Sequence, residues 1–344
     1  MTLQEILQSK GNFSGDIETI LPLFLSKVEQ QDYNAALEVL TAFPAHGKIL
    51  LWKDSKAAEV MLLLDLLCDE SDKPLVSEGK SGDFYVLYGL ALKDKGQLQK
   101  AITYLGRALE VFKGVKPLEY VETVCDIISP LRIAGELEKA QQLAEEAYSA
   151  AEAITPAETS AYWQNIVLRL LGHIETLSGN FTQAEEHLTK TLSFWQDYSK
   201  KVDYQPEGMI HAFLARLYIE RTDMDTHTAV EKAAHHADRA LALADNQKFG
   251  RDYVRGIILQ SAVALKQDHL TLAKKLSDNA LERAHSLGIA EQMGDALYLS
   301  AQIALAQHDT VTAKGLISEI MQEQTLAEHA HLQKKASELL QIIQ

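Results

Sequence analysis

A short phrase recurs along this chain at intervals of 39 and 44 residues. In each copy a glycine is followed five residues later by an alanine, and the copies span residues 96–101, 135–140 and 179–184. Helical patterns precede and follow each copy. Self-similarity at a period of 20–50 residues is the signature of a repeat architecture. The phrase therefore predicts an all-α solenoid, in which each helix-turn-helix unit packs only on its neighbours.

The pair of helices around Gly96 shows the physical logic of the repeat. Gly89 lies on the first helix, and Ala101 and Ala108 lie on one face of the second. Small residues at these positions let two antiparallel helices approach closely, while larger residues fill the gaps between them. Gly96 provides the turn, because glycine adopts a left-handed conformation without a Cβ penalty. For the same reason we expect Ala140 to lie at the tightest approach of its own pair.

Other copies are less regular. A degenerate first copy over residues 17–43 turns at Gln31 and Asp32, and two late copies turn without glycine, at Asp268 and at His308. Residues 44–80 fit no repeat, although residues 48–68 are compatible with one helix. Residues 71–82 are rich in Ser, Gly, Lys and Asp, which predicts a loop.

The spacing of large and small residues resembles the tetratricopeptide repeat (TPR). The first helix of that family carries a large residue, a leucine-like residue, a small residue and a tyrosine-like residue, and its second helix carries paired small residues. The resemblance covers most of the chain and implies a right-handed α-solenoid of about seven repeats with a C-terminal capping helix. The repeats are longer than the standard 34 residues, as in kinesin light chains and bacterial peptide-sensing regulators. We expect an N-terminal helical region at 1–80, a solenoid at 81–323 and the cap at 324–344.

Composition narrows the classes of partner. The net charge is −15, and an acidic chain lacks the Lys and Arg contacts to phosphate that dominate nucleic-acid affinity. Cys68 and Cys125 form no metal-binding spacing. Neither a signal peptide nor an apolar run long enough to cross a bilayer is visible. We therefore expect a cytoplasmic protein that binds neither nucleic acid nor membrane.

Motifs for catalysis are missing from the sequence. It contains no Gly-rich phosphate loop, no HExxH and no GxSxG, so we expect no enzyme, no cofactor and no metal. His235 and His236 are adjacent, and on a helix adjacent side chains point about 100° apart. We interpret them as a solvated pair. Trp163 and Trp195 are expected in the core, whereas Trp52 has no preferred interpretation.

In the resembling family the first helices of the repeats line a concave groove. The corresponding positions here are mainly basic or amide residues: Arg132, Asn165, Arg169, His173, Arg216 and Arg255. Asn165, Arg169 and His173 are four residues apart and share one helix face. Arginine binds carboxylates through a bidentate fork, and asparagine can satisfy both groups of a peptide backbone. The alternative is that these arginines pair with acidic residues of neighbouring helices.

Two functional hypotheses remain open. The first is an adaptor or regulator that binds a protein or peptide, with an acidic group or a free C-terminus, in the concave groove. The second is a signalling regulator whose solenoid changes shape on binding a small peptide. Chaperone C-termini are not expected as ligands, because Val86 and Leu90 occupy the positions of the lysine and asparagine in that clamp. The sequence leaves the oligomeric state open, since residues 326–343 could cap the solenoid or form a dimer.

Overall fold

The computed structural model describes residues 16–42, 56–71, 73–198, 206–247 and 250–343. Within these ranges the regular structure is helical, apart from an isolated β-bridge between Cys68 and Pro74. The chain divides into two compact units, Met1–Pro130 and Leu131–Gln344, and each is described by itself. The expected boundaries at residues 80 and 323 stay a prediction.

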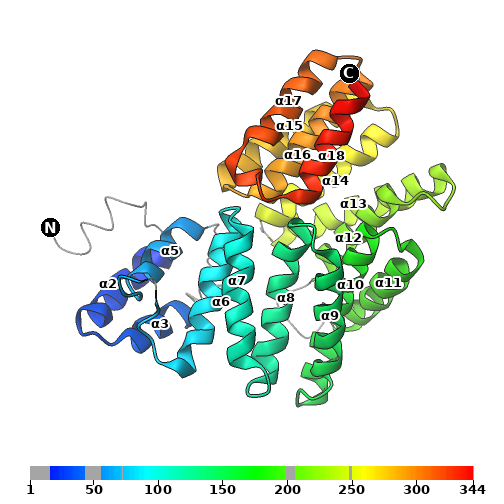
Figure 1. Ribbon diagram of the computed structural model, residues 1–344. Coiled ribbons are helices and arrows are strands. Elements are labelled where there is room, and N and C mark those ends of the chain that lie inside the picture. Colours follow the sequence, from blue (N-terminus) through cyan, green and yellow to red (C-terminus); the bar gives the residue numbers. More distant parts are fainter. Residues whose placement is uncertain (1–15, 43–55, 72, 199–205, 248–249, 344) are drawn as a thin grey trace. The chain divides into compact units, whose positions relative to one another are not determined.

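The first unit is a run of helical hairpins (Figure 1). Its helices are α2 (Asp16–Glu29), α3 (Tyr33–Thr41), α5 (Ala57–Asp65), α6 (Glu78–Asp94), α7 (Leu98–Phe112) and most of α8 (Pro117–Ile133). Helices α2 and α3 pack together, and α6 packs on α3, α5 and α7. The buried side chains include Phe84 and Phe112, each at most 2% exposed. The apolar core therefore lies between successive hairpins, as a solenoid requires.

The second unit continues the same pattern. It contains the last turn of α8, then α9 (Leu137–Ala151), α10 (Ala157–Leu177), α11 (Phe181–Tyr198), α12 (Glu207–Glu220), α13 (Thr226–Gln247), α14 (Gly250–Lys266), α15 (Leu270–Leu287), α16 (Ala290–Ala306), α17 (Thr310–Gln322), a 3₁₀ turn (Gln324–Leu326) and α18 (Ala330–Ile343). From α9 onward each helix packs on the next one, and α10, α12, α14, α16 and α18 also contact one another in sequence. We call these five helices, with the end of α8, the A layer.

The predicted turns are confirmed by the backbone. Gly96, Gly135 and Gly179 have φ values of +76°, +81° and +79°. Asp268 and His308, the predicted turns without glycine, have φ values of +60° and +61°. The turn type is thus kept in the late repeats although the glycine is lost, since single polar residues tolerate the left-handed region better than β-branched ones do.

The closest approach within a hairpin is between a glycine and the backbone of the partner helix. A Cβ built on Gly172 would lie 2.6 Å from Leu188 Cγ and 3.2 Å from the carbonyl oxygen of Ala184. Gly89 has the equivalent surroundings, at 2.7 Å from Leu105 Cγ and 3.2 Å from the Ala101 oxygen. The packing alanines are fully buried, as the sequence predicts. Helix pairs are therefore held at a distance that excludes even one additional methyl group.

Gly172→Ala is expected to lower the free energy of unfolding by about 1–3 kcal/mol, because the new methyl group overpacks the α10–α11 contact. Gly315→Ala provides the matched control on α17, where a Cβ would meet nothing within 4 Å. That substitution should stabilise the protein by about 0.5–1 kcal/mol, since alanine favours the helix over glycine. Urea denaturation followed by circular dichroism measures both, and equal effects of the two variants would contradict the packing.

One local prediction was wrong. Residues 78–82 belong to α6 and not to a loop. Gly82 is there for packing, since a Cβ on it would lie 2.4 Å from the Phe112 ring. The segment 48–68 is helical over Ala57–Asp65, while its residues 48–55 and Trp52 lie outside the described part.

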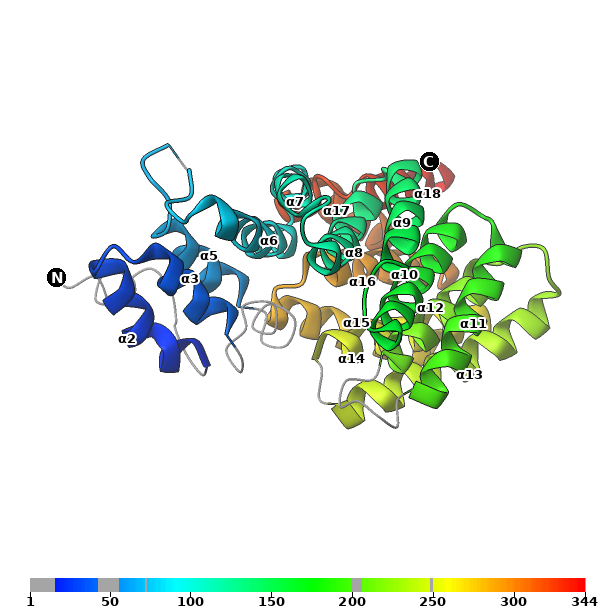
Figure 2. The ribbon, with the colours of Figure 1, turned by 90° about the horizontal axis from the view of Figure 1, so that it is seen from below.

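The second unit winds far enough for distant repeats to touch. A Cβ on Gly135, in the turn between α8 and α9, would lie 3.4 Å from Cβ of Ala330 at the start of α18. Helix α14 lies next to α12, and α16 follows on α14 (Figures 1 and 2). Helix α18 packs on α16 and α17 and buries Leu332 and Ala336. The beginning of the A layer, at the end of α8, therefore lies close to its last helix, α18.

Candidate functional site

The six predicted binding residues all belong to the A layer of the second unit. Arg132 ends α8, Asn165, Arg169 and His173 lie on α10, Arg216 on α12 and Arg255 on α14. Asn165 and His173 are buried, at 9% and 5% exposure, and the arginines are half-buried. Four successive first helices of the repeats thus each contribute a residue to one region.

Three of the four arginines have acidic partners. Arg132 pairs with Glu291 of α16, although 159 residues separate them in sequence. Arg216 lies 3.3 Å from Asp295, also on α16, and Arg255 lies 2.8 Å from Asp252 of its own helix. These three arginines therefore pair with acidic residues, as the alternative interpretation expects, but none of the partners lies on a neighbouring helix. Their partners are mostly on a helix two or more repeats away, because the second unit turns back on itself.

His173 lies at the centre of this charge cluster. Its ring stacks on Phe213 of α12, with 4.0 Å between the centroids. Burial first, and then the positive charges of Arg132 and Arg216, hold the pKa of His173 well below its usual value. The imidazole is consequently neutral at physiological pH. It serves as a hydrogen-bonding group and adds no positive charge to the cluster.

The face of α10 that carries Asn165, Arg169 and His173 has unused hydrogen-bonding capacity. Among the described residues, Asn165 Oδ1, Arg169 Nε and Nη1, and His173 Nε2 are buried without a hydrogen-bond partner. Asn165 donates through Nδ2 to the Ala161 carbonyl at 2.8 Å, which fixes its orientation. Native proteins satisfy most buried polar groups, so three orphaned groups on one helix face require an explanation. A ligand that brings both donors and acceptors would supply the missing partners.

The acidic members of the cluster were missed by the sequence reasoning. Glu291 and Asp295 lie on the A-layer face of α16, and Glu220 of α12 pairs with Lys335 of α18 at 3.2 Å. A one-dimensional pattern gives no signal for such partners, because the pitch of the solenoid decides which helices meet. His329 is also buried, at 3% exposure.

The interpretation of His235 and His236 as a solvated pair was wrong for His236. Its Nδ1 lies 2.8 Å from Nδ1 of His211, and its ring stacks on Tyr218. Burial lowers the pKa of both His211 and His236 to about 4. One ring donates and the other accepts, so the pair is neutral and joins α12 to α13. His235 is exposed, as expected.

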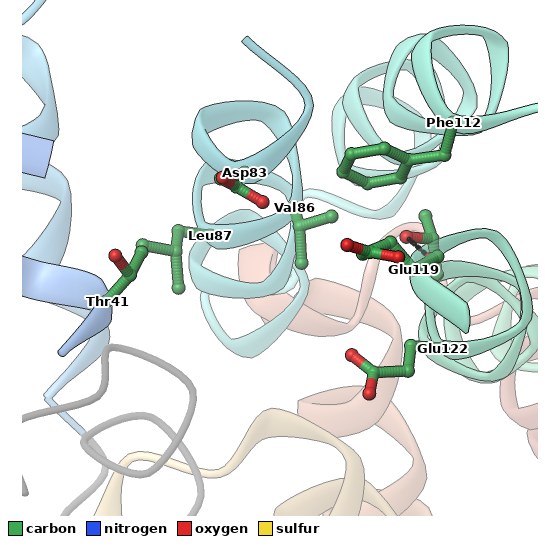
Figure 3. Close-up of a pocket in the computed structure, with 8 residues that line it drawn as sticks. Thr41, Asp83, Val86, Leu87, Phe112, Glu119 and Glu122 are labelled. Atoms are coloured by element: carbon green, nitrogen blue, oxygen red, sulfur yellow. Dashed lines mark hydrogen bonds between the residues drawn. The ribbon is translucent and has the colours of Figure 1, made fainter. Parts of the chain in front are cut away.

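The first unit has a separate hollow of about 130 Å³ between α3, α6, α7 and α8. Figure 3 shows its apolar wall, formed by Val86, Leu87 and Phe112, together with three carboxylates. The carboxylates are those of Asp83, Glu119 and Glu122. The hollow therefore has the opposite charge to the arginine cluster of the second unit.

The described residues offer little for metal or membrane chemistry. No three His, Cys, Asp or Glu side chains among them converge on a point that could hold a metal ion. None of the described helices is both long and apolar enough to cross a bilayer. Cys68 and Cys125 are half-buried, and no disulfide joins them.

Three solved structures of Rap proteins share this fold. A Rap protein in complex with competence and sporulation factor matches with a TM-score of 0.62 and 13% identity, over 95% of this chain and 92% of that one. The Rap conjugation gene regulator of plasmid pLS20, in complex with the Phr* peptide, matches with a TM-score of 0.60 and 14% identity, over 85% and 73%. The apo form of RapI gives 0.55 and 12%, over 93% and 98%.

These comparisons establish a tetratricopeptide-type helical solenoid. At such identities the likeness concerns the fold alone. No protein-family model matches the chain, and no curated protein matches it in sequence. The chemistry of the site must therefore be argued from the residues themselves.

Proposed function

We propose that this protein is a non-enzymatic regulator that binds a peptide, or an extended segment of a protein, on the α10 face of the A layer in the cytoplasm. The observation that carries the proposal is the row of orphaned groups on Asn165, Arg169 and His173. Support comes from the shared fold, since one of the similar structures was solved in complex with the Phr* peptide. Neither nucleic acid nor membrane is a partner in this proposal, and no cofactor or metal takes part.

Each orphaned group suits one part of an extended ligand. Arg169 presents Nε and Nη1, two charged N–H donors on different edges of the guanidinium group, and each can donate to a carboxylate or carbonyl oxygen. Asn165 offers an acceptor for a backbone N–H, and His173 offers one further ring nitrogen. The ligand we propose therefore has an acidic side chain or a free C-terminus near Arg169, with its backbone along α10.

Arg169→Glu is expected to abolish binding while leaving the helical content unchanged. Repulsion would replace the attraction between the guanidinium and the ligand carboxylate, which should weaken affinity at least about 100-fold. Lys190→Glu is the matched control, because it makes the same charge change at an exposed site on α11 of the same hairpin. The measurement is fluorescence anisotropy with the tightest peptide selected from a randomised library. An unchanged affinity in Arg169→Glu would refute the proposed site.

A second candidate is a signalling regulator whose solenoid changes shape on peptide binding. The ion pairs from Arg132 to Glu291 and from Glu220 to Lys335 favour it, because they join distant repeats within the same layer that carries the site. A short peptide that raises the melting temperature supports this candidate. Stable co-purification of a folded protein, without such a shift, supports the adaptor.

A further inference from the structure

The arginine cluster contains an anion of the protein itself, the carboxylate of Glu291. Arg132, Arg216 and Arg255 all lie close enough to His173 to lower its pKa, and Glu291 lies close enough to oppose them. The four residues that surround His173 come from α8, α12, α14 and α16. Glu291 is thus the carboxylate that the arginines of three repeats share.

Three features hold Glu291 in this position. It lies in the first turn of α16, where the helix dipole favours a negative charge. Burial alone would raise its pKa, but Arg132 and Arg255 outweigh that effect and keep the pKa of Glu291 far below its usual range. Its neighbour Gln292 is 3% exposed and donates to the carbonyl of Arg251 at 2.6 Å, which anchors the start of α16.

The side chain of Glu291 is nevertheless within reach of water. It is 24% exposed, whereas its partner Arg132 is 12% exposed. A carboxylate in this position can rotate toward solvent without breaking the helix that carries it. In water the Glu291 carboxylate stays hydrated, and another carboxylate can form the hydrogen bonds to the guanidinium groups in its place. The exchange should therefore cost little free energy.

The cluster also borders unused hydrogen-bond donors. Arg169 lies on the face of α10 that carries His173, one helical turn away. Within the described residues, Nε and Nη1 of Arg169 are buried without a hydrogen-bond partner. A carboxylate that reaches this face therefore meets a guanidinium group with unused donors.

We propose that Glu291 is a built-in counter-ion, which a ligand carboxylate displaces from the arginine cluster. Glu291 thereby determines specificity. A ligand that brings its own carboxylate can replace the Glu291 interaction, whereas a neutral ligand leaves the arginines with Glu291 and gains nothing from them. This inference rests on the proposed function, and it adds the group that the ligand must compete with.

Two forms of one peptide library test the displacement. The probes are randomised hexapeptides with a free carboxyl terminus and the same hexapeptides with an amidated terminus. The best binder of the wild type that contains neither Asp nor Glu is labelled in both forms. Glu291→Gln keeps the side-chain shape but removes the competing charge. It should bind the free-acid peptide about tenfold more tightly, and the amidated peptide within twofold of the wild type.

Controls separate this effect from changes in folding or in overall charge. Glu319→Gln removes one negative charge at an exposed site on α17 and should leave both affinities unchanged. Glu291→Asp keeps the charge but withdraws it from Arg132 by one methylene group, and it should also tighten binding of the free-acid peptide. This variant provides the test if Glu291→Gln folds poorly, as judged by circular dichroism.

The outcomes distinguish the two proposals. Equal or weaker binding of the free-acid peptide by Glu291→Gln or by the folded Glu291→Asp, when the wild type binds it, overturns the displacement and leaves the proposed function standing. A similar gain for the amidated peptide also overturns it, because the competition would then not involve the carboxylate. Failure of the wild type to bind either library refutes the proposed function and the displacement together.

Discussion

Trp195→Ala should destabilise the second unit by about 3–5 kcal/mol, the largest effect expected from a single core substitution in this chain. Trp195 is fully buried, and its ring packs edge-on against Tyr162, Phe194 and Tyr198 at centroid distances of 5.2–5.4 Å. Removing the indole leaves a cavity between α10 and α11 that these rings cannot close. Urea denaturation followed by circular dichroism at 222 nm measures the loss.

Trp195→Phe separates packing from polarity at the same site. The indole Nε1 is buried without a hydrogen-bond partner among the described residues, and such a donor costs about 1–3 kcal/mol. Phenylalanine removes this cost while keeping the aromatic contacts. The gain from removing the unpaired donor should nearly offset the loss of packing by the smaller ring. The free energy of unfolding of this variant should therefore lie within about 1.5 kcal/mol of the wild type. A loss of stability as large as that of Trp195→Ala would contradict this expectation, and would mean that the shape of the indole or a hydrogen bond of its Nε1 stabilises the fold.

Arg132→Ala is the second substitution with a large expected effect, a loss of about 3 kcal/mol. It leaves the carboxylate of Glu291 half-buried and without its hydrogen-bonded cation, although Arg255 remains nearby. Breaking a buried pair by removing one partner is costly, because the other charge stays desolvated. The same urea titration gives the free energy, and hydrogen exchange at the start of α16 should increase although that helix is 159 residues away in sequence.

A double variant tests whether the loss of stability comes from the unpaired carboxylate of Glu291. Arg132→Ala with Glu291→Gln should be more stable than Arg132→Ala alone, since no unpaired carboxylate remains. Lys139→Ala serves as the matched control, because its pair with Glu136 lies at 3.2 Å on the surface, where the two side chains are 53% and 34% exposed. That variant should change stability by no more than about 0.5 kcal/mol. Additive losses in the double variant would contradict the proposed role of charge.

The turns and packing positions of this fold were predictable from local sequence. Gly96, Gly135 and Gly179 predict the left-handed turns, and the alanines five residues later predict the buried contacts between paired helices. Both signals survive because they depend on residues within one hairpin. The same local reasoning misjudged Gly82, since a glycine that makes room for Phe112 looks identical in sequence to one that makes a turn.

The site was predictable only in part. The helical spacing of Asn165, Arg169 and His173 correctly grouped them on one face, because spacing within a helix fixes direction. The acidic partners of Arg132 and Arg216 on α16 were not predictable. Glu291 approaches Arg132 only because small rotations between repeats accumulate over several hairpins, and no pattern in the sequence encodes that sum. The binding role of the six residues remains a prediction.

The contact between Gly135 and Ala330 and the pair of Arg132 with Glu291 have a consequence for unfolding. In an open stack the terminal hairpins fray first, and the middle melts later. Here both ends of the second unit hold each other, so fraying at α18 removes support from the turn before α9. The helices from α9 to α18 consequently support one another from both ends, and we expect them to unfold in one cooperative step.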